Sequence, residues 1–264
     1  ESAEEQAAFD VYDANNINPL YGFFVARAGL GASENMRSKL AEYNDPRLSR
    51  AFITKQGTSG KEQAPGTADN AVYAPNGTPE QGTSKYGTSL FMYSISAPTL
   101  LLSYHELKFL EAEALCRLER DAKSALKDAV VAGLLNAENS FTISRKELGK
   151  TLINAANSIT EAEAESYFDN TIEAKYTAEP LKTTMTQKYF ALWGASGEAT
   201  ESYNDVRRMK GLGENFIELK NPNSFPLRCP YGNSDTTTNA EVKAAYGNGQ
   251  YVYSENVWWA GGSR

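Results

Sequence analysis

Residues 103–134 have the pattern of two amphipathic helices with almost no connection between them. In the first half, apolar residues recur at spacings of three and four, as on one helix face: Leu107, Leu110, Ala114 and Leu118. The second half begins at Asp121, a helix-capping residue type, and continues with the same period. Because only Glu119 and Arg120 separate the halves, the two helices must pack antiparallel. The sequence therefore predicts a mainly α-helical fold of tetratricopeptide-like hairpins, with long irregular loops and a coil-rich C-terminal segment.

Other stretches of the chain carry the start and stop signals of helices. Ser33 is an N-cap residue type ahead of an apolar stripe, and Asn44-Asp45-Pro46 ends that stripe. Thr160 and Glu163 have the spacing of a capping box, which predicts a helix from Thr160 onward. Two more helices are expected, joined by a Gly-Ala-Ser-Gly connection: Thr183–Trp193 and Glu198–Met209.

Two regions lack a helical period. Residues 54–89 are rich in Gly, Thr, Ser, Pro and Asn, which predicts a long loop of the kind that is usually functional or mobile. Beyond Gly211 we expect coil, turns and a small strand pair, with Tyr251 and Tyr253 on the same side of one strand. Further along this extended chain, the Trp258-Trp259 pair would point to opposite sides, so that one ring is buried and the other exposed.

Composition and charge exclude several classes of protein. The net charge of −7 provides no basic surface for nucleic acid, and the longest apolar runs are far too short to span a bilayer. The chain begins at Glu1 without Met or a visible signal peptide, which suggests a trimmed or truncated product. Two cysteines are too few for a disulfide framework. Cys116 falls on an apolar helix face and is expected to be a buried free thiol.

The residue patterns of catalytic sites are absent from the sequence. His105 is the only histidine, so no His-rich metal site can form, and we expect it to be an ordinary, partly buried side chain. Pairs of carboxylates are common but have the positions of solvated helix faces. Asp13–Asn18 and Asn233–Asp235 are oxygen-rich and could hold calcium, although they lack the full calcium-loop spacing and are more typical of turns. We therefore predict no enzyme activity and no cofactor, with calcium as a weaker alternative.

The last third of the chain contains a series of short motifs: Gln187-Lys188 followed by an aromatic residue, Glu198, Tyr203-Asn204-Asp205, Arg207-Arg208, Pro226 with Arg228, Pro230-Tyr231, Asn239 and Trp258-Trp259. In this order and spacing they resemble the SusD/RagB family of Bacteroidetes surface lipoproteins. Earlier segments, Asn18–Gly29 and Asn44–Leu48, are similar to the middle of that family. The family often has Trp at the position of Tyr203 and an aromatic residue at that of Cys229. The resemblance covers nearly all of this chain, but only the later part of a longer family member.

The resemblance implies a single SusD-like helical domain over residues 1–264, as the C-terminal part of a longer protein. It also implies a non-enzymatic protein on the extracellular face of the outer membrane, held there by a lipid anchor that this chain lacks. Such a protein binds an oligosaccharide or other small oligomer and delivers it to a SusC-like TonB-dependent transporter. The alternative is a helical scaffold or adaptor that binds a protein partner and no sugar, because tetratricopeptide-like helix pairs commonly do so.

Sugar binding requires aromatic rings that stack on pyranose faces, together with amides and hydroxyls for the sugar hydroxyls. The long loop contains both kinds of group, so we predict a ligand site there: Tyr73, Tyr86, Asn70, Asn76 and Gln81. Both tyrosines are expected to be exposed. Arg207 and Arg208 follow at a helix end, where we expect a structural role in which Arg208 binds backbone carbonyls of the C-terminal segment.

Overall fold

The computed structural model describes residues 6–27, 31–56, 61–63, 73–77, 86–149, 152–153, 157–194, 197–220, 224–249 and 251–262. The chain divides into two compact units, Glu1–Leu219 and Lys220–Arg264, and each is considered by itself. The expectation of a single domain over residues 1–264 stays a prediction. No helix in the described ranges is long and apolar enough to cross a membrane.

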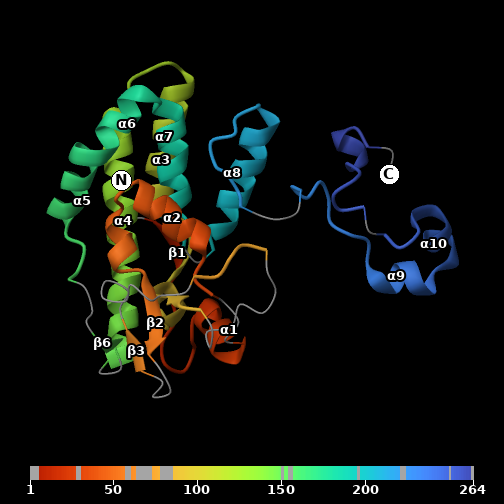
Figure 1. The fold of residues 1–264 in the computed structure, drawn as a ribbon, viewed down its shortest axis with the longest axis horizontal. Helices are drawn as coiled ribbons and strands as arrows, with labels where there is room; N and C mark the ends of the chain where they lie inside the picture. Colours follow the sequence, from red (N-terminus) through yellow and green to blue (C-terminus); the bar gives the residue numbers. More distant parts are fainter. Residues whose placement is uncertain are drawn as a thin grey trace. The chain divides into compact units, whose positions relative to one another are not determined.

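The larger unit is a stack of helices, as the sequence predicts. Its helices after the N-terminal part are α3 (Tyr104–Arg117), α4 (Lys123–Leu148), α5 (Glu161–Tyr167), α6 (Glu173–Ala178), α7 (Pro180–Ala191) and α8 (Ala199–Gly211). The α3–α4 hairpin is confirmed, and α3, α4, α6 and α7 lie side by side (Figure 1). The prediction of a mainly α-helical fold is therefore confirmed.

Local capping signals set where these helices begin. The Ser103 hydroxyl accepts a hydrogen bond from the Glu106 amide at 3.1 Å, and the Thr160 hydroxyl accepts one from the Glu163 amide at 3.2 Å. Each satisfies one of the amides that a helix start leaves unpaired. The Glu163 carboxylate lies 2.9 Å from a guanidinium nitrogen of Arg50, so it ties α5 to another part of the fold.

The core of the larger unit lies where α3, α4 and α7 meet. Phe109, Leu126, Phe141 and Phe190 are all fully buried there. Each such side chain stabilises the fold by about 1.5–3 kcal/mol relative to exposure. Gly133 allows α4 and α7 to approach, since a Cβ at this position would lie 2.9 Å from the Cβ of Ala191.

The N-terminal part of the larger unit adds short helices and strands. They are α1 (Pro19–Arg27), α2 (Glu34–Glu42), β1 (Ala7–Phe9), β2 (Phe52–Gln56), β3 (Lys61–Gln63), β4 (Thr88–Ser89), β5 (Thr99–Leu102) and β6 (Leu152–Ile153). The strand β1 pairs antiparallel with β5, and a second sheet has the order β4-β2-β3-β6. The prediction of a continuous loop over residues 54–89 is thus wrong where β2, β3 and β4 form. β2 pairs antiparallel with β3, which is close to it in sequence. The β2–β4 and β3–β6 pairs join distant segments, and no local pattern reveals them.

The smaller unit contains two short helices, α9 (Asn233–Thr238) and α10 (Ala240–Tyr246). Asn239 ends the first and caps the second, because its side chain accepts hydrogen bonds from the Glu241 and Val242 amides. Tyr251 and Tyr253 lie in a turn, so the predicted strand at this position is wrong.

Trp258 and Trp259 lie in a 3-10 turn over Trp258–Ala260. They are 72% and 69% exposed, and their rings meet edge to face with centroids 5.6 Å apart. The prediction that one ring is buried is wrong. It assumed an extended chain with alternating sides, whereas a 3-10 turn rotates successive side chains by about a third of a turn.

Candidate functional site

Two of the predicted ligand residues lie beside the start of α2. The Ser33 hydroxyl donates a hydrogen bond to Asn76 Oδ1 at 2.8 Å, and the Glu34 amide donates one to the Ala74 carbonyl at 3.0 Å. These bonds fix the segment 73–77 against the helix. Tyr73 is half-buried, with its ring edge-on to Phe52 at 5.2 Å between centroids.

Arg37, which the sequence did not indicate as a ligand residue, lies beside Tyr73. The guanidinium carbon of Arg37, on the exposed side of α2, lies 5.5 Å from the centroid of the Tyr73 ring. Burial raises the pKa of Tyr73 although Arg37 lowers it, so the phenol stays protonated at neutral pH. Arg37, Tyr73 and Asn76 therefore present a guanidinium, a ring and an amide together. We call these three residues the α2 surface.

The remaining predicted ligand residues have different outcomes. Tyr86 is only 8% exposed, so the expectation that it is an exposed loop residue is wrong. It lies two residues before β4, and the Ala32 amide donates a hydrogen bond to the Gly87 carbonyl at 2.7 Å, which holds this part of the chain inside the fold. Asn70 and Gln81 lie outside the described residues.

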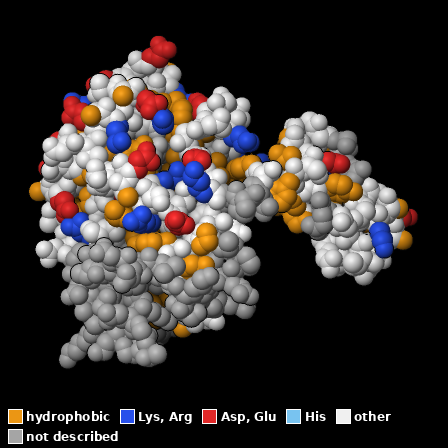
Figure 2. Space-filling model, viewed as in Figure 1, with side chains coloured by type: hydrophobic (Ala, Val, Ile, Leu, Met, Phe, Trp, Pro, Cys, Tyr) orange, Lys and Arg blue, Asp and Glu red, His pale blue; other side chains and the backbone are white. Residues whose placement is uncertain are grey.

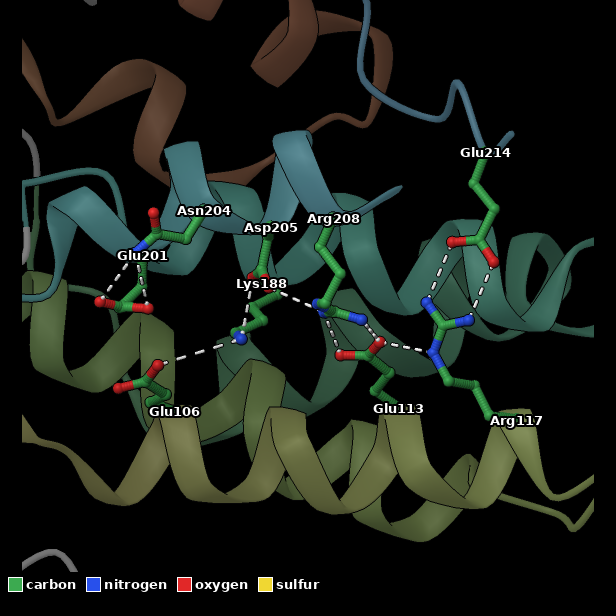
Figure 3. A network of polar contacts seen from close by, with 9 residues as sticks. All are labelled: Glu106, Glu113, Arg117, Lys188, Glu201, Asn204, Asp205, Arg208 and Glu214. Carbon is green, nitrogen blue, oxygen red and sulfur yellow. Dashed lines mark hydrogen bonds and ion pairs between the residues drawn. The ribbon is translucent and has the colours of Figure 1, made fainter. Parts of the chain in front are cut away.

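A network of charged side chains joins α3, α7 and α8 (Figure 3). Lys188 Nζ on α7 lies 2.8 Å from Asp205 on α8 and 3.9 Å from Glu106 on α3. Arg208 on α8 binds both carboxylate oxygens of Glu113 on α3, one of them at 2.8 Å. Such paired charge-assisted hydrogen bonds fix orientation as well as adding stability.

Arg208 also donates to Asp205 at 2.8 Å, so both of its partners are carboxylates. The prediction that Arg208 binds backbone carbonyls of the C-terminal segment is therefore wrong in its acceptor. The structural role is retained, because the arginine connects two helices. Arg207 points elsewhere, with its guanidinium carbon 5.6 Å from the centroid of the exposed Tyr203 ring.

The inner end of this network carries a buried pair of carboxyl groups. Glu198 accepts a hydrogen bond from the Ser103 amide, and its other oxygen lies 3.7 Å from Nε2 of His105. Burial and the nearby Glu198 raise the pKa of Glu106 to about 7. Burial and the positive charge of Arg47 lower the pKa of His105 to about 4, so the imidazole is neutral. His105 is 1% exposed, more buried than the sequence suggested.

The described residues include no group of three or more His, Cys, Asp or Glu side chains that could hold a metal ion. The Asp13 carboxylate accepts hydrogen bonds from the Asn15 and Asn16 amides at 2.7 and 2.8 Å, as in an Asx turn. The expectation of no cofactor, with calcium as the weaker alternative, stays a prediction. Cys116 is a half-buried free thiol whose pKa is raised by burial, and Cys229 is free and exposed.

The chain matches a family model over residues 1–231, and that family is described as SusD-like, starch-binding and associating with the outer membrane. A solved SusD/RagB family protein from Bacteroides thetaiotaomicron VPI-5482 is 64% identical, with a TM-score of 0.89. The match covers 100% of this chain and 57% of that one. A SusD homolog from Bacteroides fragilis NCTC 9343 is 19% identical, with a TM-score of 0.63, and the match covers 96% of this chain and 57% of that one. No curated protein matches the chain.

Proposed function

This chain belongs to the SusD-like family of outer-membrane-associated nutrient-binding proteins, and on that premise we propose that it binds an oligosaccharide at the cell surface. We further propose that the ligand passes to a SusC-like TonB-dependent transporter on the extracellular face of the outer membrane. The observation that supports glycan binding in this chain is the α2 surface, where a ring, an amide and a guanidinium lie together.

The α2 surface has the chemistry that a sugar requires. An aromatic ring such as Tyr73 offers an apolar face to pyranose C–H groups, and its hydroxyl can exchange hydrogen bonds with the sugar. The Arg37 guanidinium offers several donors in a fixed plane, and the Asn76 side-chain nitrogen adds a further donor. Because Ser33 and Phe52 hold Asn76 and Tyr73 in place, little conformational entropy is lost on binding.

The proposed mode of action is binding without catalysis. Acidic and basic side chains are interspersed over the face of the larger unit drawn in Figure 2, which suits a neutral ligand better than a highly charged one. A neutral, buried His105 is also poorly placed to exchange a proton with a ligand in solution.

Isothermal titration calorimetry against a panel of neutral hexasaccharides (malto-, cello-, xylo- and mannohexaose) tests the proposal. Arg37→Ala should weaken binding by roughly fivefold, since a hydrogen bond from the guanidinium to a sugar hydroxyl contributes about 1 kcal/mol. Tyr73→Leu, which keeps an apolar side chain against Phe52, should weaken binding by a similar factor.

Arg207→Ala provides a matched control, because Arg207 is also an exposed arginine beside a tyrosine ring. It should bind as the parent does. If Arg37→Ala and Tyr73→Leu also bind as the parent does, the α2 surface is not the site. If no hexasaccharide binds the parent but a protein partner does, the adaptor alternative replaces the glycan-binding function.

A further inference from the structure

A groove of about 420 Å³ lies over one side of α4, between the first turn of α3 and the start of α5. Its size is within the range of roughly 300–1,000 Å³ that small-molecule sites occupy. None of the predicted ligand residues and none of the α2 surface lines it. The groove is therefore a separate feature of the larger unit.

The floor of the groove is apolar. Val131 and Leu135, one turn apart on α4, are only half-buried, and Ala132 lies between them. Tyr104, in the first turn of α3, contributes an aromatic ring at one side. Together these side chains offer a narrow apolar strip that C–H groups of a ligand could cover.

Polar groups without protein partners surround this strip. Within the described residues, the side-chain amides of Asn136 and Asn139 and the hydroxyl of Tyr104 make no hydrogen bond. Each amide can donate and accept, and the hydroxyl can do both. Convergent unused polar groups around an apolar floor are the usual composition of a ligand site.

The charges at the rim indicate which ligands fit. Asp128, Glu161 and Glu165 line the groove, whereas the one lysine, Lys127, is 2.7 Å from Asp169 in an ion pair. An anionic ligand would be repelled by three carboxylates, while neutral hydroxyls can donate hydrogen bonds to them. A sugar hydroxyl both donates and accepts, which matches the amides as well.

We propose that this groove is a second carbohydrate-binding subsite that takes a short, neutral oligosaccharide segment. The proposal rests on the proposed glycan-binding function, but it places a separate part of the ligand on α4. Uronic-acid or sulfated glycans are excluded by the carboxylate rim. The α2 surface and the groove contact different sugar residues, so each can be disabled without the other.

Calorimetry with the same four neutral hexasaccharides tests the subsite on the full chain. The double variant Asn136→Ala/Asn139→Ala and the single variant Tyr104→Ala should each weaken binding by roughly tenfold, as expected when two hydrogen bonds or one stacking contact are lost. The unfolding midpoint of the double variant should match that of the parent, since neither amide makes a hydrogen bond within the described residues. Oligogalacturonate, an acidic oligosaccharide, should not bind at the groove.

The outcomes separate the two proposals. If Arg37→Ala weakens binding and the groove variants do not, the groove is not a subsite and the proposed function stands. If none of the hexasaccharides binds the parent, both proposals fail. Binding of tetralysine with no hexasaccharide binding would replace the subsite with a site for basic peptides.

Discussion

Glu106 should make the stability of the larger unit depend on pH near neutrality. Its side chain is 8% exposed, and burial together with Glu198 raises its pKa to about 7. Lys188 acts in the opposite direction, but its ammonium is closer to Asp205, at 2.8 Å, than to Glu106, at 3.9 Å. Glu201 adds a further negative charge. The folded protein therefore holds a proton on Glu106 that the unfolded chain releases more readily.

The sign follows from which state binds the proton more tightly. The ordinary pKa of this carboxyl is 4.5, and the folded value is about 7. Between these values the folded state carries more protons, so this contribution is complete below pH 4.5 and is lost as the pH rises through about 7. At roughly 1.4 kcal/mol for each pH unit, the difference corresponds to about 3 kcal/mol of unfolding free energy.

Replacing Glu106 by Gln tests this reasoning, because the amide resembles the protonated carboxyl and cannot ionise. Urea unfolding followed by circular dichroism from about pH 5 to about pH 8 should show the parent losing stability and Glu106→Gln losing much less. Glu111→Gln is the control, since Glu111 is an exposed glutamate of α3 paired with Lys108 at 3.0 Å. It should follow the parent. An equal pH slope in Glu106→Gln and the parent would refute the role of the buried carboxyl.

Two further substitutions test the network and a helix end. Arg208→Ala should lower the unfolding free energy measured in urea by about 1–2 kcal/mol, because it removes the paired hydrogen bonds to Glu113. Arg208→Lys should be more stable than Arg208→Ala but less stable than the parent, because an ammonium cannot form the same planar pair. An unchanged midpoint in Arg208→Ala would contradict a stabilising role of the Arg208–Glu113 pair. Gly194→Ala should destabilise by about 1–3 kcal/mol, since φ is +80° and a Cβ would lie 2.4 Å from the Phe91 ring. Gly211→Ala, with open space around its Cα, is the matched control and should melt at or above the parent temperature.

The helices could be predicted because their signals are local. Ser33 and Thr160 cap helices as predicted, Ser103 does the same, and each accepts a hydrogen bond from the amide three residues ahead. The prediction that Asp121 caps the next helix is wrong, because Ala122 is the cap residue of α4 and Asp121 accepts a hydrogen bond from the Lys123 amide at 3.0 Å. The apolar period of the α3–α4 hairpin identifies its buried face in the same way. In both cases the information lies within one or two helical turns.

The β2–β4 and β3–β6 pairs and the burial of Tyr86 could not be predicted, because they depend on partners far along the chain. The strand β3 pairs with β6 across the whole of α3 and α4, and nothing near Lys61–Gln63 indicates this. Tyr86 lies in a stretch of small polar residues, but the strand Thr88–Ser89, which follows it, pairs with β2. Likewise Arg208 donates a hydrogen bond to Glu113, and the sequence around Arg208 gives no sign of this distant acceptor.

Several motifs that identify the family hold helices of this chain together and do not line the proposed ligand sites. Lys188, Asp205 and Arg208 belong to the charged network, and Glu198 holds the first turn of α3 through the Ser103 amide. A sequence can therefore keep these motifs, and with them the packing of α3, α7 and α8, while the ligand changes. Ligand choice would then depend on residues outside the motifs, and the α2 surface and the α4 groove both consist of such residues.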